Sequence, residues 1–209
     1  MKKGTIFYFY DALCGWCYGF SPVMMEVYEK YKDEYDFQVI SGGMMTGERA
    51  GPIGEVAPFI KDGYKQVEER SGVKFSEAFL KDILEEGSTE FTSIPTAVAL
   101  SVFKQHKPQE QVAFASRLQK AIYFDAIQPM DTEAYGKMAE EFGLNGEEFI
   151  AQMQDKKIVE QSFEEFSVCQ QIGVNGFPTL AVDKGEGKLY AIARGYVPLE
   201  MVEENLKNL

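Results

Sequence analysis

The chain has 209 residues, of which 45% are hydrophobic, and a net charge of −12 at pH 7. This length and composition fit one or two globular domains with a real hydrophobic core. The negative charge argues against general nucleic-acid binding, which needs a basic surface. No apolar run approaches the roughly 18 residues of a membrane helix. We therefore expect neither nucleic acid nor a membrane among the partners.

The amino terminus predicts a strand and not a targeting segment. The run Thr5–Tyr10 follows Met1-Lys2-Lys3 and has the aromatic composition of a β-strand. A secretory signal needs a longer apolar region and a cleavage site with small residues, whereas this run ends at Asp11. We expect a cytoplasmic protein.

Two cysteines follow this strand at the spacing of a redox centre. The segment Cys14-Gly15-Trp16-Cys17 stands between the strand and a helical pattern at Pro22–Lys32. One helical turn brings positions i and i+3 onto the same face, within reach of a disulfide. The unpaired N–H groups and the dipole of a helix N-terminus favour a thiolate there. The pattern predicts a dithiol–disulfide centre.

The middle of the chain changes from strand to helical periodicity. A second strand, Phe37–Ile40, is closed by Ser41-Gly42-Gly43. Capping residues and prolines then predict a series of helices. These helices begin near Ala57, Ser76, Ser93, Pro108 and Asp131, with ends expected at Gly72, Gly87 and Leu144-Asn145-Gly146. A mostly helical segment, 47–171, therefore interrupts a strand-rich unit.

The third cysteine and the single histidine are not expected to bind a metal. Cys169 falls in a helical pattern and is interpreted as a small buried hydrophobe, with a resolving or regulatory thiol as the alternative. His106 is expected at the surface end of a helix, and one histidine with no second cysteine pair does not build a zinc site. We expect no metal and no cofactor.

Strands return near the end of the chain. Strands are predicted at Thr179–Val182 and Leu189–Ala193, joined by a turn at Lys184–Gly187, and a helix over Leu199–Leu206 closes the chain. Gly176-Phe177-Pro178 precedes the first of these strands. A proline at the mouth of a strand marks an edge or a bulge, unless it is held cis in a tight turn.

A strand, C-x-x-C, a helix and a later X-Pro-Thr entering a strand resemble the thioredoxin fold. With its helical insertion the chain resembles the DsbA-like branch, and the segments Asp11–Gly19 and Ser41–Met44 with Gly47-Glu48-Arg49 resemble its signal-less FrnE-type members. The resemblance implies an α/β thioredoxin fold with a large all-helical insertion. It divides the chain into a discontinuous thioredoxin-fold domain, 1–46 and 172–209, and an inserted helical domain, 47–171.

The same resemblance implies the roles of the site residues. Cys14 is expected to attack substrate disulfides, and Cys17 to resolve the mixed disulfide. The Phe177–Pro178 bond is expected to be cis and adjacent to Cys14, an ordinary trans turn being the alternative. Trp16, Phe177 and Thr179 are expected to contact substrate, although Trp16 would equally serve as a lid over the helix end.

Two features near the cysteines leave alternatives open. A carboxylate at Asp11 would oppose a thiolate at Cys14, relay a proton to Cys17, or satisfy N–H groups of the turn, which is the commoner arrangement. The pairs Met24-Met25 and Met44-Met45 would line a pliable groove for unfolded peptides or pack in the core, as methionines at helical spacing more often do.

The leading functional prediction is a cytoplasmic thiol–disulfide oxidoreductase. Periplasmic DsbA-type oxidants usually carry a histidine between the cysteines, whereas Gly15-Trp16 offers neither its N–H nor its charge. A couple near about −200 mV in a cytosol near about −280 mV would rest reduced, so the protein would act as a reductase or isomerase. Its partners would be disulfide-containing proteins, peptides or small molecules and a cellular thiol reductant.

Two other functions fit the same resemblance. Some relatives are glutathione-dependent transferases or isomerases, but they generally carry serine where this chain has Cys14. Other cytosolic relatives are non-enzymatic adaptors that present a regulator to a protease, in which case the dithiol would be a redox sensor. Saturable glutathione binding would identify the first, and the lack of disulfide turnover the second.

Overall fold

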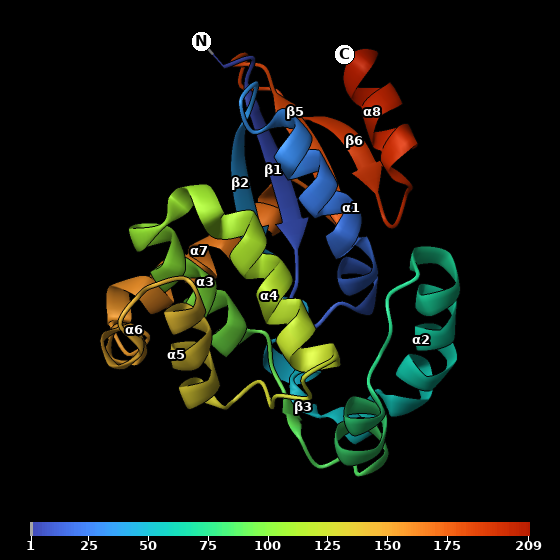
Figure 1. The fold of residues 1–209 in the computed structure, drawn as a ribbon, viewed down its shortest axis with the longest axis vertical. Helices are drawn as coiled ribbons and strands as arrows, with labels where there is room; N and C mark the ends of the chain where they lie inside the picture. Colours follow the sequence, from blue (N-terminus) through green and yellow to red (C-terminus); the bar gives the residue numbers. More distant parts are fainter. Residues whose placement is uncertain (1) are drawn as a thin grey trace.

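The computed structural model describes residues 2–209 and is built around one four-stranded sheet (Figure 1). The strands are β1 (Thr5–Tyr10), β2 (Asp36–Ser41), β5 (Thr179–Asp183) and β6 (Tyr190–Arg194), in the spatial order β2-β1-β5-β6. β1 pairs parallel with β2 and antiparallel with β5, and β5 pairs antiparallel with β6. All four strands agree with the predicted ones to within one or two residues, the usual uncertainty of element ends.

The central strand β1 is apolar on both faces. Because successive side chains of a strand point to opposite sides, Ile6, Tyr8 and Tyr10 face one layer while Phe7 and Phe9 face the other. The register places Tyr10 beside Ser41 of β2 and Phe9 beside Thr179 of β5. The end of β1 therefore meets the start of β5, so the loop before Thr179 lies near the cysteines that follow β1.

Helices α1 (Gly15–Tyr31) and α8 (Leu199–Lys207) cover the first face. The helix after the cysteines begins earlier than the pattern at Pro22–Lys32 indicated, because Cys14 is its N-cap and Pro22 lies inside it. A proline in a helix interior normally removes a hydrogen bond and kinks the chain. The helix nevertheless begins at the cysteines, where the C-x-x-C pattern predicted a helix N-terminus.

The chain between β2 and β5 is mainly helical and lies largely below the sheet in Figure 1. It contains α2 (Ala57–Ser71), a π-type helix η3 (Phe79–Glu85), α3 (Ile94–His106), α4 (Gln111–Tyr123), α5 (Thr132–Glu141), α6 (Gly146–Gln152) and α7 (Lys156–Gln171). Single-turn helices at Gly47–Arg49, Ile53–Glu55 and Pro108–Glu110 and a short pair of strands, β3 (Gly51–Pro52) and β4 (Glu90–Phe91), connect them.

One helix boundary differs from its prediction. The Asn145-Gly146 pair was expected to end the helix that Asp131 caps, but the Asn145 side chain caps the start of α6 by accepting a hydrogen bond from Glu148 N. The left-handed position that follows α5 is Gly143, with φ of +76°. Asparagine serves both helix starts and left-handed turns, so its identity alone does not decide between them.

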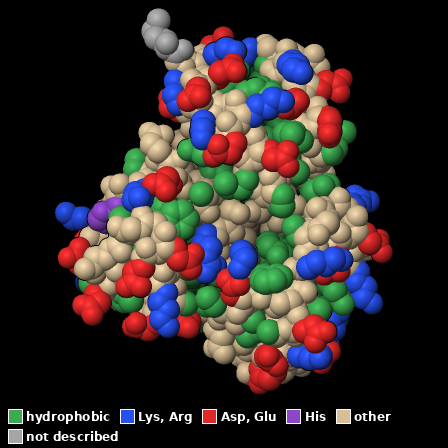
Figure 2. All heavy atoms as spheres, in the orientation of Figure 1, with side chains coloured by type: hydrophobic (Ala, Val, Ile, Leu, Met, Phe, Trp, Pro, Cys, Tyr) green, Lys and Arg blue, Asp and Glu red, His purple; other side chains and the backbone are tan. Residues whose placement is uncertain are grey.

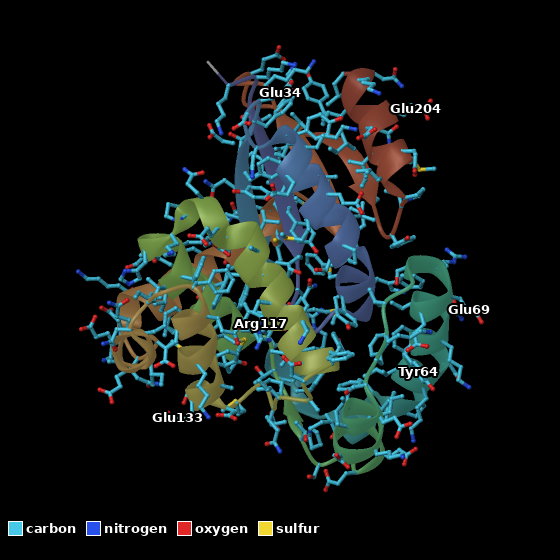
Figure 3. All side chains as sticks on the ribbon, viewed as in Figure 1. Glu34, Tyr64, Glu69, Arg117, Glu133 and Glu204 are labelled. Carbon is cyan, nitrogen blue, oxygen red and sulfur yellow. The ribbon has the colours of Figure 1, made fainter. Side chains whose placement is uncertain are left out.

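Two of the inserted helices pack directly on the sheet layer. α4 lies against α1 and β2, and its Arg117, labelled in Figure 3, forms ion pairs with Glu141 at the end of α5 and with Asp125. α7 covers the second face of the sheet, where Cys169 packs with Phe9. The division of the chain into a thioredoxin-fold domain, 1–46 and 172–209, and an inserted helical domain, 47–171, stays a prediction.

No helix within residues 2–209 is both long and apolar enough to cross a membrane.

Candidate active site

Cys14 is the residue at which β1 is joined to α1. It is the N-cap of α1, in extended conformation, and its backbone N–H donates to Asp11 O at 3.1 Å. The side chain of Cys14 is only 7% exposed and that of Cys17 is fully buried. Both residues are therefore shielded from bulk solvent, because inserted helices pack against α1.

The three cysteines are free thiols, and those of the C-x-x-C pair have opposite pKa shifts. A hydrogen bond from the Cys17 thiol, helped by the backbone N–H groups of Cys17 and Trp16, lowers the pKa of Cys14 although burial opposes the shift. Burial raises the pKa of Cys17 well above its ordinary value, and the neighbouring Cys14 sulfur raises it further. The helix start thus favours one thiolate, on Cys14.

The loop before β5 closes over this thiol. The Phe177–Pro178 peptide bond is cis, and the Cys14 thiol donates to Phe177 O across 3.5 Å. Pro178 is buried, and its carbonyl accepts from Gly195 N at 2.7 Å. The Thr179 hydroxyl donates to Gly176 O at 2.8 Å, which closes the turn. Residues 163 positions apart in the chain are therefore in contact at the sulfur.

The Phe177 ring points away from the thiol. It lies flat against the backbone of Gly42, where an added Cβ would stand only 2.0 Å from the ring. The ring also packs against the cluster of Phe9 and Cys169 on the second face of the sheet. The backbone of Phe177, and not its side chain, is the part that faces Cys14.

Asp11 joins the end of β1 to the inserted segment. Its buried carboxylate accepts hydrogen bonds from Leu13 N at 2.9 Å, Met44 N at 2.7 Å and the Ser93 hydroxyl at 2.9 Å. Burial raises the pKa of Asp11, and these three donors partly offset the effect. The structure thus shows the turn-capping arrangement and extends it to Ser93, the N-cap of α3.

An apolar cavity of about 290 Å³ opens beside Cys14. Its walls include the segment Leu13–Trp16 around Cys14, the loop that carries Met44 and Met45, and one face of α2. Figure 2 shows hydrophobic side chains gathered on this face between α1 and α2. The lining residues are Leu13, Cys14, Gly15, Trp16, Met44, Met45, Val56, Phe59, Ile60, Gly63, Tyr64, Val67, Phe75, Phe91 and Tyr123. Met44 and Met45 therefore line a groove, whereas Met24 is buried in the core.

Trp16 lines this cavity and also contacts two residues outside its lining. The indole is half-buried, with the Arg70 guanidinium 5.8 Å above its ring and the Tyr196 ring centroid 6.3 Å away. Arg70 belongs to α2 and Tyr196 follows β6. The ring lines the cavity, and its contact with substrate stays a prediction, as does its alternative role as a lid over the helix end.

The remaining candidates lie away from the dithiol's helix start. Cys169 is 2% exposed, its thiol donates to Ser41 O at 3.6 Å, and burial raises its pKa to about 12. His106 is exposed at the end of α3, as expected, and hydrogen-bonds Gln152. Within residues 2–209 no three His, Cys, Asp or Glu side chains are grouped as a metal site would require.

The sequence analysis missed the contribution of α2 to the site. The side chains of Ile60, Tyr64 and Val67 follow one face of this helix, and Tyr64 is labelled in Figure 3. Phe59 remains 81% exposed at the rim. The spacing of these residues, three or four apart, was a usable signal of one apolar face. The pattern alone does not say which part of the protein that face covers.

Comparison with known proteins agrees with this geometry. The model of the DSBA-like thioredoxin domain matches residues 5–207. The chain belongs to this family. The membership confirms the α/β thioredoxin fold with its helical insertion and the resemblance on which the site was predicted. No curated protein matches the chain by sequence.

Solved structures show the same family fold. A "putative protein disulfide isomerase" from Nitrosomonas europaea is 22% identical, with a TM-score of 0.85 over 99% of this chain and 97% of its own. The cytosolic disulfide reductase DsbM from Pseudomonas aeruginosa is 24% identical, with a TM-score of 0.81 over 98% and 100%. It has also been solved with GSH, with a TM-score of 0.80.

A third structure of this shape has another activity. A 2-hydroxychromene-2-carboxylate isomerase is 11% identical, with a TM-score of 0.65 over 98% of this chain and 95% of its own. At these identities the likeness to any of the three shows the fold alone. The chemistry of this chain has to be argued from its own residues.

Proposed function

We propose that this protein is a thiol–disulfide oxidoreductase that reduces or isomerises disulfides with the Cys14–Cys17 dithiol. The observation that carries the proposal is the placement of Cys14 at the N-cap of α1, where neighbouring donors lower its pKa. A thiolate is the nucleophile of disulfide exchange, so this sulfur is the one that attacks. Cys17, whose pKa burial raises, stays protonated until it resolves the adduct.

The reaction has two exchange steps. The Cys14 thiolate attacks one sulfur of the substrate disulfide, forms a mixed disulfide and releases the other substrate sulfur as a thiolate. Cys17 then loses its proton and attacks Cys14, which forms the Cys14–Cys17 disulfide and releases the second substrate sulfur. The substrate gains two electrons and the dithiol loses two. A cellular thiol such as glutathione reduces the dithiol again.

The substrate lies between the loop before β5 and the apolar cavity. An extended segment pairs with the backbone of Phe177, next to Pro178 and Thr179, as peptides pair with exposed strand ends. An apolar side chain beside the substrate disulfide enters the cavity against Trp16 and Met44. These contacts suit a disulfide in an unfolded protein or peptide.

A reducing compartment fits the direction of the reaction. No histidine stabilises the Cys14 thiolate from within the C-x-x-C segment, so the dithiol is a weaker oxidant than its periplasmic relatives. We place the protein in the cytoplasm, where glutathione keeps such a pair reduced. The cytosolic DsbM, which has also been solved with GSH, supports this placement and this reductant.

The experiment that tests the proposal is capture of the mixed disulfide. A Cys17→Ser variant is incubated with oxidised, unfolded peptide substrate, and the adduct is located by mass spectrometry after proteolysis. We expect one substrate molecule linked to Cys14. No adduct at Cys14, together with no disulfide turnover by the wild type, would overturn the proposal and favour a non-enzymatic adaptor. Saturable glutathione binding without exchange would favour a glutathione-dependent isomerase.

A further inference from the structure

A buried hydroxyl in β1 has no hydrogen-bond partner. Tyr8 is 2% exposed, and among the described residues its hydroxyl oxygen makes no hydrogen bond. Such orphan groups are rare in folded proteins, because each loses its bonds to water without replacement. The tyrosine ring alone would pack equally well as phenylalanine, so the presence of the hydroxyl calls for an explanation.

The candidate hydrogen-bond partner of the Tyr8 hydroxyl is the thiol of Cys17. Tyr8 faces the α1 layer and shares its core cluster with Cys17 and Phe20. The ring is held between Phe20 and Tyr10, with centroids 6.2 Å and 5.3 Å away. Phe20 follows Cys17 by one helical turn, so Tyr8 packs against the face of α1 that carries Cys17. Burial raises the pKa of Tyr8 well above its usual value, and the charge of Cys17 raises it further. The hydroxyl therefore keeps its proton.

We infer that the Tyr8 hydroxyl donates a hydrogen bond to the Cys17 sulfur when that sulfur becomes a thiolate, and so acts as the positioning residue of the resolving step. A neutral thiol is a weak acceptor, which explains the unpaired hydroxyl of the resting dithiol. A thiolate is a strong one, so the bond forms only on the way to the transition state, where stabilisation accelerates the reaction. This inference rests on the proposed function of the dithiol.

The step balances without any further reagent. In the mixed disulfide, the Cys17 thiol releases its proton to solvent, and Tyr8 donates to the resulting sulfur anion without giving up its own proton. The anion attacks Cys14, the Cys14–Cys17 bond forms, and the bond from Cys14 to the substrate sulfur breaks. The hydrogen bond to Tyr8 is lost as the charge moves to the departing substrate.

The next tyrosine on the same face supplies a matched control. Tyr10 is as deeply buried as Tyr8 and belongs to the same strand. Burial raises the pKa of Tyr10 well above its usual value, and the charges of Asp11 and Glu165 act on its hydroxyl more strongly than that of Cys17 does. Tyr8→Phe and Tyr10→Phe thus remove the same atom from neighbouring positions, and only the first removes the proposed donor.

The first experiment measures Cys17 by itself. In a Cys14→Ser, Cys169→Ala background Cys17 is the only thiol, and its ionisation is followed by thiolate absorbance. The other titratable groups that face it are Asp11, Tyr8, Tyr10 and Tyr123, together with Cys14, which the background removes. We expect Tyr8→Phe to raise the pKa of Cys17 by about one unit, a tenfold loss of thiolate, and Tyr10→Phe to leave it within about 0.3 units.

The second experiment separates the two chemical steps. Two proteins are compared, the Cys169→Ala variant with Tyr8 intact and the same variant carrying Tyr8→Phe. Each is mixed with a substrate disulfide, and the adduct is followed by rapid acid quench. We expect unchanged formation of the adduct and about tenfold slower resolution in Tyr8→Phe. Equal resolution rates in an active protein, or an unshifted pKa of Cys17, would overturn the inference about Tyr8 and leave the proposed function intact. A wild type that forms no adduct would instead refute the proposed function.

A third variant decides the matter if Tyr8→Phe does not fold. A single 3-fluorotyrosine at position 8 keeps the shape of the ring and makes the hydroxyl a stronger donor. We expect it to lower the pKa of Cys17 in the single-thiol background. No change, or a shift in the other direction, would contradict the proposed hydrogen bond.

Discussion

The start of α1 and the last turns of α7 each hold a buried cysteine, with opposite consequences. Cys14 is 7% exposed and Cys169 is 2% exposed, so both lie out of bulk water. The pKa of Cys14 is lowered, whereas that of Cys169 is raised to about 12. Each thiol donates to a carbonyl, Cys14 to Phe177 O and Cys169 to Ser41 O. Cys14 also receives hydrogen bonds from the Cys17 thiol and from backbone N–H groups at the helix start.

The comparison shows that hydrogen-bond donors, and not exposure, distinguish a reactive thiol in this fold. Burial disfavours a thiolate at both positions. At the start of α1 the S–H of Cys17 and the N–H groups of Cys17 and Trp16 overcome that effect, whereas the backbone N–H at Cys169 does not. A variant that removes a donor or moves the sulfur should therefore cost activity, whereas a change at α7 should cost stability at most.

The largest effect is expected from exchanging the two thiols for inert side chains. Cys14→Ser should reduce disulfide turnover to the uncatalysed background, because it removes the attacking thiolate. Cys169→Ala should leave turnover within about twofold, because burial and the charges of Glu165 and Asp11 disfavour a thiolate there. Turnover is measured by reduction of insulin with a thiol reductant. A large loss in Cys169→Ala, with a normal circular dichroism spectrum, would make Cys169 a redox partner and remove the distinction.

A smaller effect is expected from disturbing the loop before β5. In Gly42→Ala the new methyl group overlaps the Phe177 ring, since its Cβ would lie 2.0 Å from that ring. The ring and its backbone must move away from Cys14, and we expect turnover to fall by about tenfold or more, because displacements of about 1 Å at a catalytic site have effects of this size.

The matched control for Gly42→Ala adds a methyl group to the same loop in open space. A Cβ at Gly176, the residue before Phe177, would meet no atom within 4 Å. Gly176→Ala should therefore keep turnover within about twofold. Equal rates for the two variants would show that the position of the Phe177 backbone does not control the chemistry at Cys14.

The smallest effect is a change in how stability depends on pH. The pKa of Asp11 is raised from 3.8, so the folded protein keeps a proton that the unfolded chain has already lost. Stability contributed by this proton is present below about pH 3.8 and is lost as the pH rises through the higher pKa of the folded state. As the pH rises between the pKa values of the unfolded and the folded state, the free energy of unfolding of the wild type should fall relative to that of Asp11→Asn. The expected decrease is at most about 1.4 kcal/mol per pH unit in this range, with no further change above it.

Urea unfolding of both proteins at several pH values measures this difference. Asparagine keeps the size of the side chain and one acceptor oxygen, so the comparison isolates the titration of residue 11. A wild type that gains stability relative to Asp11→Asn as the pH rises from 4 would mean that the donors at Leu13, Met44 and Ser93 outweigh burial.

Most of the fold followed from local sequence signals. The aromatic composition of β1, the glycine after α2 and the aspartate before α5 are local signals, which is why the corresponding ends were predicted correctly. The periodicity of α1 was recognised only from Pro22 onward, whereas the cysteine motif correctly placed the start of the helix at Cys14. Asn145 was misassigned because the same side chain suits the end of one helix and the beginning of another.

Some residues of the site could be predicted from the sequence, and others could be found only in the structure. Cys14 and Cys17 could be named in advance because the spacing of their motif expresses its chemistry, and Pro178 could be named because of the family resemblance. Tyr8, the α2 wall and the link from Asp11 to Ser93 depend on which elements pack together over separations such as 82 residues. No local pattern carries that information. The roles of the named residues stay proposals until they are measured.

The most direct test of the account is the pH dependence of alkylation at each cysteine of the folded wild type. The protein is labelled briefly with iodoacetamide between pH 5 and 10, and mass spectrometry reports the rate at Cys14, Cys17 and Cys169 separately. The account predicts that Cys14 reacts first, with a pKa below the ordinary value of 9.0, and that Cys17 and Cys169 react only well above it. Faster labelling of Cys17 or Cys169 than of Cys14 near neutral pH would contradict it.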